Sequence, residues 1–366
     1  MVRAARASPG GGMKHRIAFV APTLEILGGQ GVQASTLADA FRQDGWALDF
    51  IPINPGFPRG FRWLRRVPYV RTLLNEAFYL MRLADLRRAD VVHVFSASYW
   101  SFLLAPAPAI LAARCLGKPV VLNYRSGEAD DHLARWGVLV HALLGLVDEI
   151  VVPSEYLRAI FKRYGYRARV IPNVVDLSRF RYRERRAPAP RLVSTRNLEP
   201  YYRVDNTLEA FALLRARYPE ATLTLAGSGS EERRLRELAA SLGTGGIRFV
   251  GRVEPTAMPG LLDTADIFVN SSVVDNQPVS VLESFASGLP VVSTGTGDIA
   301  AMVRDGETGL IVSPDDPAAL VKAVTGLLDD PERAVRIARL ARAEVEKYTW
   351  ARVKELWASV YSERAA

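Results

Sequence analysis

Short, nearly continuous runs of apolar residues alternate along the chain with segments of helical length. Such runs are typical of strands in parallel sheets that helices cover on both faces. They cover residues 16–22, 47–53, 90–96, 119–124 and 149–154, and then residues 191–195, 221–227, 247–251, 266–272, 289–294 and 309–313. The pattern predicts an α/β protein in which the same series of strands and helices begins twice.

An arginine- and proline-rich stretch at residues 179–191 separates the two series. Segments of this composition commonly link domains, and a length of 366 residues suits two domains. The sequence therefore predicts two Rossmann-like, doubly wound domains, with ligands in the cleft at the carboxyl ends of their strands. The expected limits are a disordered leader at 1–12, a first domain at 13–186, a second at 187–345 and a final helix at 346–366.

The composition indicates a globular protein of a reducing compartment. Hydrophobic residues make up 49% of the chain, and a single cysteine, Cys115, rules out an internal disulfide framework. The basic N-terminal residues lack the apolar core of a signal peptide, and the apolar stretch at 102–111 is too short to span a membrane. The four histidines show no metal-binding spacing. These features favour a cytoplasmic protein without a dedicated transition-metal site.

The charge is unevenly distributed along the chain. Residues 1–190 contain 27 Lys and Arg against 15 Asp and Glu, a net charge of +12, whereas the remainder contains 20 against 24, a net charge of −4. A basic half indicates an anionic partner. An anionic membrane surface or a phosphorylated acceptor is favoured over nucleic acid, because the chain contains no recognised nucleic-acid-binding module.

One segment, residues 57–88, combines basic and aromatic residues in a way that suits an anionic lipid surface. The basic residues are Arg62, Arg65, Arg66, Arg71 and Arg82, and the aromatic residues are Trp63, Tyr69, Phe78 and Tyr79. An ordinary amphipathic helix with a solvated basic face would give the same pattern. Both interpretations stay open at the level of the sequence.

Two glycine-containing turns have the composition of phosphate-binding loops. Gly28, Gly29 and Gly31 come directly before a predicted helix, where glycine lets the backbone approach a ligand and the helix dipole favours anions. Gly227 lies in a tight turn after a strand, although an ordinary strand-to-helix turn explains it equally well. The first loop is not a GxGxxG fingerprint, and no acidic residue ends the next strand, so a classical NAD site is only weakly supported.

The most informative stretch is DNQPVSVLESFASGLPVV, residues 275–292. A strand end and a loop precede a helix that should start near Val279, after Pro278, whose missing N–H suits a helix entry. The free N–H groups of the first helical turn would face the cleft and suit a diphosphate. Asp275 and Glu283 could bind hydroxyl groups at opposite ends of one extended ligand, although Glu283 could also serve only to complement the helix dipole.

These motifs resemble glycosyltransferase family 4, a family of retaining enzymes with the GT-B fold. The family's E-x7-E signature and its A-x-A-x-G-x-P-V continuation correspond here to Asp275, Glu283 and residues 284–291. The resemblance covers nearly the whole chain from Arg16 and includes the motifs VPSEYLRAIFKRYG, VIPNVVDLSRF, STRNLEP, LAGSGS, FVGRVE, VRDGETGLIVSPDD and YTWARVKELWASVY. It implies an acceptor-binding first domain, a facing nucleotide-sugar-binding domain, and a final helix that crosses back onto the first.

The resemblance also implies an activity. A hexosyltransferase of this family would move a sugar from a nucleotide-diphosphate sugar, with UDP favoured over GDP, to a hydroxyl of a glycan or lipid-linked acceptor. No cofactor and no obligatory metal are implied, because arginine and helix N–H groups would balance the charge and the leaving phosphate would take the acceptor proton. Synthesis would occur in the cytoplasm, with contact between the basic half and the inner membrane face as a further interpretation.

Residue roles follow from the same resemblance. Glu283 would bind the ribose, Asp275 the transferred sugar and Arg196 the diphosphate, where charge develops in the transition state. The expected catalytic residues are Asp275, Arg196 and Arg125. The expected donor-binding residues are Gly28, Gly29, Gly31, Arg196, Arg203, Gly227, Arg252, Val253, Gln277, Pro278, Val279, Val281, Leu282 and Glu283, with Arg252 and Val253 beside the base and the backbone of Val281 and Leu282 at the phosphates.

Three positions depart from the family pattern. Asp275 is one methylene shorter than the usual glutamate, and Arg125 stands where the first domain often has a histidine. The usual lysine after the family's arginine is absent, and either Arg203 or Tyr202 takes its place. Alternatives therefore stay open: a nucleotide-sugar- or lipid-binding protein that has lost activity, or an enzyme of the same fold with other chemistry, such as a sugar-nucleotide epimerase or a phosphorylase.

Overall fold

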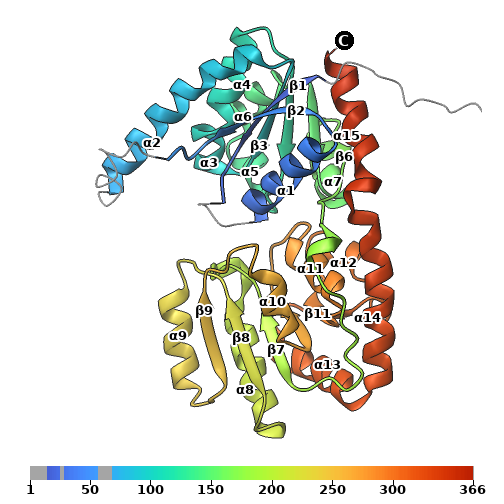
Figure 1. Ribbon diagram of the computed structural model, residues 1–366. Coiled ribbons are helices and arrows are strands. Elements are labelled where there is room, and N and C mark those ends of the chain that lie inside the picture. The colour runs from blue at the N-terminus through green and yellow to red at the C-terminus, as the bar shows by residue number, and fades with distance from the viewer. Residues whose placement is uncertain (1–14, 25–28, 57–67, 366) are drawn as a thin grey trace, which may run out of the picture.

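The computed structural model describes residues 15–24, 29–56 and 68–365 and contains two parallel sheets of six strands, one above the other in Figure 1. Helices lie on both faces of each sheet. This arrangement confirms the α/β fold class predicted from the alternating apolar runs. The expected leader at 1–12 lies outside the described residues.

The first sheet has the strand order β2-β1-β3-β4-β5-β6. Its strands are β1 (Arg16–Ala21), β2 (Ala47–Pro52), β3 (Val91–Ser96), β4 (Val120–Tyr124), β5 (Glu149–Val152) and β6 (Arg169–Val170). The helices around it are α1 (Gly29–Gln43), α2 (Pro68–Arg82), α3 (Tyr99–Leu104), α4 (Pro106–Cys115), α5 (Ala129–Arg135), α6 (Gly137–Leu144) and α7 (Glu155–Arg163), with short 3-10 turns η2 (Leu83–Arg88) and η3 (Leu177–Arg179). The edge strand β6 was not predicted, because two residues are too few to form an apolar run.

The second sheet has the order β12-β11-β10-β7-β8-β9. Its strands are β7 (Arg191–Ser194), β8 (Thr222–Ala226), β9 (Ile247–Gly251), β10 (Ile267–Asn270), β11 (Val291–Thr294) and β12 (Leu310–Val312). Its helices are α8 (Val204–Arg217), α9 (Glu232–Ser241), α10 (Met258–Asp263), α11 (Val279–Ser287), α12 (Ile299–Met302), α13 (Pro317–Asp329) and α14 (Pro331–Val345), with 3-10 turns η4 (Pro200–Tyr202) and η5 (Glu346–Tyr348) before the last helix, α15 (Trp350–Ala365).

The strand orders place a ligand cleft between the sheets. In each sheet the chain reverses its direction of winding at the first strand, since β1 lies between β2 and β3, and β7 lies between β8 and β10. Loops that leave such a switch point diverge and open a crevice at the carboxyl ends of the strands. Residues that follow β1, β3 and β4 and residues that follow β7, β8 and β10 line one shared cleft.

The last helix, α15, completes the core of the first half, although it follows the second sheet in the chain. In Figure 1, α14 runs beside the second sheet and α15 continues along the first. Trp357 and Tyr361 are buried among side chains of β1, α1 and β3, and the rings of Trp350 and Phe41 lie 4.6 Å apart in an edge-to-face arrangement. The return of the final helix to the first half is therefore confirmed.

Residues 180–190, which connect the two halves, contain neither helix nor strand but are fastened to the second half by arginine. The Arg185 side chain is 1% exposed and lies 3.6 Å from the Asp266 carboxylate, which is 2% exposed. Arg183 and Arg191 also pair with Asp266. The Arg185 guanidinium further donates to the carbonyl groups of Arg183, Leu262, Ala265 and Ser287. These three arginines balance a buried carboxylate, so they are not part of a surface for an anionic partner.

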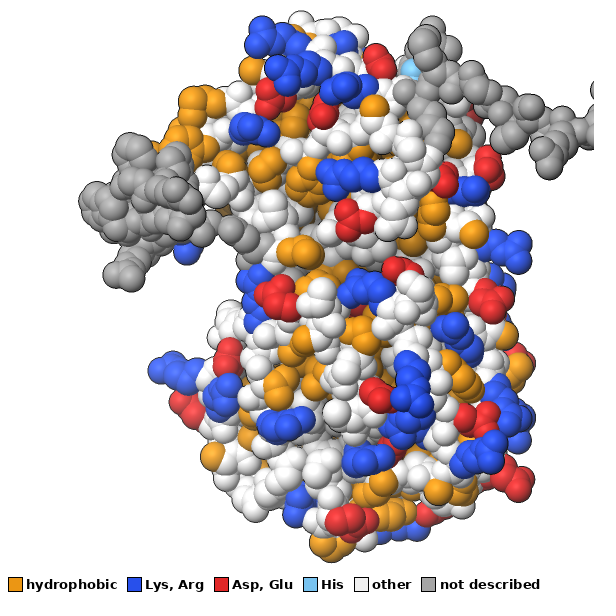
Figure 2. Space-filling view, in the orientation of Figure 1, with side chains coloured by type: hydrophobic (Ala, Val, Ile, Leu, Met, Phe, Trp, Pro, Cys, Tyr) orange, Lys and Arg blue, Asp and Glu red, His pale blue; other side chains and the backbone are white. Residues whose placement is uncertain are grey.

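Many basic side chains in the described part of the first half have acidic partners nearby. Ion pairs join Arg16 to Asp49, Arg82 to Asp85, Arg114 to Asp148, Arg135 to Asp131, Arg158 to Glu155, Arg163 to Asp130 and Arg169 to Glu149. Basic and acidic side chains are also intermixed on the face of the molecule seen in Figure 2. The excess of basic residues therefore does not translate directly into an unbalanced positive surface.

The segment predicted to suit an anionic membrane is only partly described, because residues 57–67 lie outside the described residues. Within α2, Tyr79 is fully buried and donates a hydrogen bond of 2.6 Å to the Ala105 carbonyl. Its predicted place at a lipid interface is therefore wrong. Leu73 and Met81 of the same helix are exposed. None of the helices in the described ranges has both the length and the apolar character needed to cross a bilayer, and membrane association stays a prediction.

Replacing Arg185 by alanine should destabilise the protein strongly, because the buried Asp266 would lose a partner and four carbonyl groups would each lose a hydrogen bond. Removing one partner of a buried ion pair costs about 3–5 kcal/mol. We therefore expect Arg185→Ala to lower the free energy of unfolding in urea by at least about 3 kcal/mol. Arg186→Ala is the matched control, because the Arg186 side chain is 84% exposed and exposed ion pairs contribute less than about 1 kcal/mol. Equal losses in the two variants would contradict the structural role of Arg185.

Candidate active site

The cleft between the two sheets has a volume of about 570 Å³. This volume is typical of pockets that bind ligands of a few tens of atoms. Both halves of the chain line it: the turns after β1, β3 and β4 contribute from the first half, and the turns after β7, β8, β9 and β10 together with α11 contribute from the second. A ligand in the cleft would therefore contact both halves at once.

Helix α11 begins at this cleft. It starts at Val279, as predicted, and Pro278 precedes it in an extended conformation. The N–H group of Val281 donates to the Pro278 carbonyl at 3.2 Å, which leaves the N–H groups of Val279 and Ser280 for a ligand. Val281 and Leu282, expected to meet the phosphates through their backbone, have side chains in the hydrophobic core and do not line the cleft.

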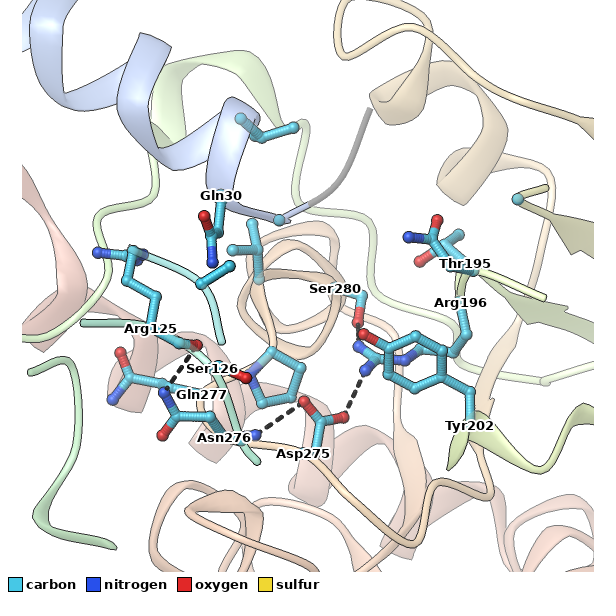
Figure 3. A pocket seen from close by; sticks show the side chains of 18 of the residues that line it. Gln30, Arg125, Ser126, Thr195, Arg196, Tyr202, Asp275, Asn276, Gln277 and Ser280 are labelled. Carbon is cyan, nitrogen blue, oxygen red and sulfur yellow. Dashed lines mark hydrogen bonds and ion pairs between the residues drawn. The ribbon is translucent and has the colours of Figure 1, made fainter. Parts of the chain in front are cut away.

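Asp275 and Arg196 form a buried ion pair in the cleft (Figure 3). Arg196 Nη2 lies 2.5 Å from Asp275 Oδ2, and each side chain is 8% exposed. Arg196 Nη1 donates to Ser280 Oγ at 2.9 Å, in the first turn of α11. The ring of Tyr202 covers the guanidinium, with its centroid 4.2 Å from the central carbon. The pair is thus held from three sides before any ligand enters.

Glu283 lies one turn further along α11 and lines the same cleft. The residue is 8% exposed, and no hydrogen bond or ion pair joins its carboxylate to another residue of the described part of the chain. Burial raises the pKa of Glu283 to about 7, and the charge of Arg179 offsets this only in part. A buried carboxylate without a partner costs free energy, so a ligand that offers hydroxyl donors would relieve that cost.

The loop that carries Asp275 is attached to the first half by its next two residues. Asn276 Oδ1 accepts a hydrogen bond of 2.5 Å from Ser154 Oγ. Gln277 binds Asn173 twice, since its side-chain oxygen accepts from the Asn173 N–H and its carbonyl accepts from the Asn173 amide, each at 2.6 Å. The Gln277 amide also donates to Asp298 at 3.1 Å. Burial raises the pKa of Asp298 to about 6, and the hydrogen bond from Gln277 lowers it in part.

A chain of buried hydrogen bonds connects the cleft with the final helix. Arg125 Nη1 donates to Asn123 Oδ1 at 3.2 Å, Asn123 Nδ2 lies 3.1 Å from His93 Nε2, and His93 Nδ1 lies 2.6 Å from Tyr361 Oη. The side-chain oxygen of Asn123 accepts from Arg125, so the side-chain NH2 group of Asn123 must donate to His93 Nε2. His93 then carries its proton on Nδ1 and donates it to the Tyr361 hydroxyl. Burial and the charge of Arg125 lower the pKa of His93 well below its usual range, which agrees with a neutral ring.

Arg125 lines the cleft at the position where the family often has histidine. Its guanidinium contacts the side-chain oxygen of Asn173 as well as that of Asn123. Burial lowers the pKa of Arg125 to about 9, so the group stays charged at neutral pH. It can bind an anion or a hydroxyl group but cannot shuttle a proton.

Two glycines allow close backbone approaches at the site. Gly227 has a φ of 152°, and a Cβ atom there would lie 2.2 Å from the Arg196 carbonyl oxygen. Gly297 has a φ of 60°, and a Cβ atom there would lie 2.0 Å from the Asp275 carbonyl oxygen. Both backbone conformations favour glycine, and both glycines support the backbone of the ion pair.

The structure brings most of the predicted site residues together. The cleft is lined by Gly29, Gly227, Arg252, Val253, Gln277, Pro278, Val279 and Glu283, and by all three expected catalytic residues, Asp275, Arg196 and Arg125. Gly29 and Gly31 form the first turn of α1 and not a loop before it, and Gly31 is buried away from the cleft. Gly28 lies outside the described residues.

Tyr202, and not Arg203, faces the cleft at the position of the family's lysine. Arg203 has a left-handed backbone, with φ 46° and ψ 45°. Its guanidinium pairs with Asp205 and Asp315 and donates to Asn206, so the side chain is engaged away from the cleft. The expectation that Arg203 binds the donor is therefore corrected.

Several cleft residues have no counterpart in the sequence predictions. They include Gln30, Trp100, Glu128, Asn173, Tyr201 and Asn276 in the lining, and Gly297 and Asp298 behind it. Asn173 lies within the motif VIPNVVDLSRF, which was a usable signal. The others depend on contacts between residues distant in the sequence. No group of three or more His, Cys, Asp or Glu that could hold a metal ion is found in residues 15–24, 29–56 and 68–365.

Comparisons with known proteins cover almost the whole chain. Residues 27–179 match the family model described as Glycosyltransferase Family 4, and residues 180–344 match the model described as Glycosyl transferases group 1. The glycogen synthase of Mycobacterium tuberculosis (strain H37Rv) is 33% identical over 298 residues, which is 75% of this chain and 69% of that protein. The phosphatidyl-myo-inositol mannosyltransferase of Mycolicibacterium smegmatis is 27% identical over 281 residues, 74% of this chain and 70% of that protein.

Solved structures share the architecture at low sequence identity. Anabaena HepE in complex with UDP-glucose has a TM-score of 0.76 and 16% identity over 95% of this chain and 100% of its own. Sucrose-phosphate synthase from Thermosynechococcus elongatus has a TM-score of 0.76 and 20% identity over 95% of this chain and 98% of its own. The two matched family models, the glycogen synthase relative and the two facing sheets lead to one conclusion: this chain belongs to glycosyltransferase family 4 and has the GT-B fold.

Proposed function

We propose that this glycosyltransferase moves a hexose from a UDP-sugar to a hydroxyl group of a glycan or lipid-linked acceptor, with retention of the anomeric configuration and without a metal ion. The observation that carries the proposal is Glu283, a buried carboxylate that lines the cleft and has no partner among the described residues. A ribose supplies two neighbouring hydroxyl groups, which are the donors that such a carboxylate lacks.

The rest of the donor would extend from Glu283 along the first turn of α11. The N–H groups of Val279 and Ser280 lie at the positive end of the helix dipole and suit a diphosphate. Asp275 lies beyond them and suits the hydroxyl groups of the transferred sugar. Structures of similar fold in complex with UDP-glucose or UDP, such as those of HepE, support UDP as the nucleotide.

Arg196 would neutralise the charge that develops on the leaving diphosphate. In the proposed step the bond between the anomeric carbon and the diphosphate oxygen breaks, and its electron pair goes to that oxygen. The acceptor oxygen bonds to the anomeric carbon on the same face, and its proton passes to the leaving diphosphate. The ion pair with Asp275 and the hydrogen bond to Ser280 hold Arg196 in place, and in this proposal Arg196 takes the role that a metal ion would otherwise have.

The proposal places synthesis in the cytoplasm, and a lipid-linked acceptor would bring the first half to the inner membrane face. The exposed Leu73 and Met81 of α2 suit such a contact. A protein that only binds nucleotide sugars, or an epimerase, would bind UDP in the same way. Incubation with a panel of UDP- and GDP-sugars separates these activities, because only a transferase forms a glycosidic product, whose anomeric configuration NMR reveals.

Glu283→Gln should weaken UDP binding, because an amide is a weaker acceptor for ribose hydroxyl groups than a carboxylate. Hydrogen bonds to charged groups contribute about 1.5–3 kcal/mol each, so we expect the dissociation constant for UDP to rise by about tenfold to a hundredfold in isothermal titration calorimetry. The control is Glu237→Gln in α9, whose side chain is 70% exposed and far from any cleft residue in the sequence. Unchanged UDP affinity in Glu283→Gln would refute the assignment of the ribose site.

The same substitution should stabilise the protein in the absence of nucleotide, and only at higher pH. The pKa of Glu283 is about 7 in the folded protein against a reference value of 4.5, so the folded state binds the proton more tightly. The stability that this group contributes is present at low pH and is lost as the pH rises through about 7. A difference of this size corresponds to about 3 kcal/mol, so Glu283→Gln should exceed the wild type by up to about 3 kcal/mol at about pH 8. In urea unfolding the gain should shrink as the pH falls from about 7 and should vanish below the reference pKa of 4.5.

Arg196 and Arg203 should differ sharply in a kinetic test. Loss of a group that stabilises transition-state charge costs about 2.7–4 kcal/mol, so Arg196→Ala should lower kcat by at least about a hundredfold. Arg203→Ala should change kcat by less than about threefold, because its guanidinium is bound to Asp205 and Asp315 away from the cleft. The rate of sugar release from the UDP-sugar, measured as UDP formed, reports both. Comparable losses in the two variants would show that Arg203 supplies donor-site charge.

A further inference from the structure

The first half of the chain presents an exposed aromatic ring to the cleft. Trp100 is 68% exposed and is among the residues that line the cleft. Its ring packs edge-to-face against that of Trp136, with the centroids 5.2 Å apart and the planes at 90°. The contact with Trp136 orients the indole while a large part of its surface stays open to solvent. The donor site described above does not use this ring.

The backbone that positions Trp100 is strained. Tyr99, the preceding residue, has a φ of 55°, a left-handed conformation that costs an L-residue roughly 1–2 kcal/mol. The Tyr99 hydroxyl donates to Asp131 of α5, and its ring packs edge-to-face against that of His132. The tight turn from β3 into α3 therefore places Trp100 at the cleft at an energetic cost, which is a feature of positions with a function.

A carboxylate without a partner lies on the same side of the cleft. Glu128 lines the cleft, and no hydrogen bond or ion pair joins its side chain to another residue in the described part of the chain. Burial and the charge of Asp131 raise the pKa of Glu128. The carboxylate contributes, after burial, to the raised pKa values of Tyr99 on its own side and Tyr201 on the opposite side. Glu128, Tyr99 and Tyr201 all line the same cleft.

Glu128 lies close to the loop that carries Asp275, because the preceding residue, Gly127, packs against that loop. Gly127 is packed so closely against the Asp275 backbone that a Cβ atom on it would lie 3.0 Å from the Asp275 carbonyl oxygen. Glu128 is thus one residue from a direct contact with the loop proposed to hold the transferred sugar. A ligand bound by Glu128 and Trp100 would adjoin that sugar from the side of the first half.

We propose that Trp100 and Glu128 form the acceptor subsite and that the group they bind is an uncharged sugar, whose ring stacks on Trp100 and whose hydroxyl groups donate to Glu128. The inference rests on the proposed transferase function and assigns the acceptor class for that site. An aromatic face and a carboxylate together match the apolar face and the hydroxyl rim of a pyranose.

Charge decides between neutral and anionic acceptors. A phosphate or uronate placed at Glu128 would meet that carboxylate, and repulsion between like charges at close range costs about 1–4 kcal/mol, depending on how far the site is exposed to water. Arg196 is already paired with Asp275, and Arg125 is oriented by hydrogen bonds to the neutral side chains of Asn123 and Asn173, so neither arginine forms an ion pair with Glu128. The anionic acceptor inferred from the net charge of the first half is therefore disfavoured.

The test uses the full chain with UDP-glucose, UDP-galactose and UDP-N-acetylglucosamine as donors. The acceptor probes are neutral p-nitrophenyl glucosides, mannosides and galactosides, compared with p-nitrophenyl glucuronide and glucose-6-phosphate. We expect transfer to at least one neutral glycoside, with a kcat/KM at least about tenfold above that for the anionic probes. Trp100→Ala should raise the KM for that glycoside by about tenfold, and Trp100→Phe should restore most of the loss.

Glu128→Gln should lower kcat/KM for the same glycoside by about tenfold, because the charged carboxylate that accepts hydrogen bonds from the sugar hydroxyl groups is lost. In all these variants the dissociation constant for UDP and the rate of donor hydrolysis in water should stay at wild-type values. Leu111→Ala is the control for loss of an exposed apolar side chain, since Leu111 is 49% exposed on α4 and does not line the cleft.

The two levels of the proposal fail in different ways. If the wild type neither binds UDP nor hydrolyses a UDP-sugar, the proposed function is refuted and the acceptor subsite with it. The acceptor inference alone is refuted in two cases, both with intact donor binding and hydrolysis. Either no sugar is transferred to any neutral glycoside, or kcat/KM is higher for an anionic probe than for the neutral ones. An unchanged acceptor KM in Trp100→Ala, together with unchanged UDP affinity, would likewise exclude the stacking role of Trp100.

Discussion

The pairing of Gln277 with Asn173 is the contact on which the site depends. It joins a loop of the second half to the first half through two buried hydrogen bonds of 2.6 Å. Breaking it would leave buried polar groups without partners, at about 1–3 kcal/mol for each group. Because Gln277 also binds Asp298, the loop is fixed from both sides. Asp275, two residues earlier, therefore meets Arg196 in a defined geometry.

Side chains of the protein itself hold Arg196 and Arg125 in place at the cleft. Arg196 is paired with Asp275 and covered by the ring of Tyr202, and Arg125 is bound by two asparagine side chains. Glu283 and Glu128, whose carboxylates have no partner among the described residues, lie on opposite halves. Preorganised charge of this kind lowers the reorganisation needed at the moment of reaction. It also makes hydroxyl groups the complementary ligands on both sides.

The sequence predicts the architecture well because apolar strands and helix-length segments are local signals. It also predicts Asp275, Glu283 and the start of α11, since these lie within one short stretch. It fails where neighbours in the chain point in different directions: Tyr202 faces the cleft, whereas the left-handed backbone at Arg203 turns the next side chain toward Asp315. Asn173 and Asp298 escape prediction for another reason, because their partner Gln277 is far away in the sequence.

The place of α15 has a consequence for the way the chain is made. Trp357 and Tyr361 belong to the core that surrounds β1, α1 and β3, so that core stays open until residues 350–365 have left the ribosome. Domains usually fold in order as they are synthesised, and the second half, which has a core of its own, can fold without this wait. The first half is therefore synthesised first but completes its folding last. Its apolar surface around Phe41, which Trp350 and Trp357 cover in the finished structure, would stay uncovered for most of translation. Chain-binding chaperones would meet the protein at that surface.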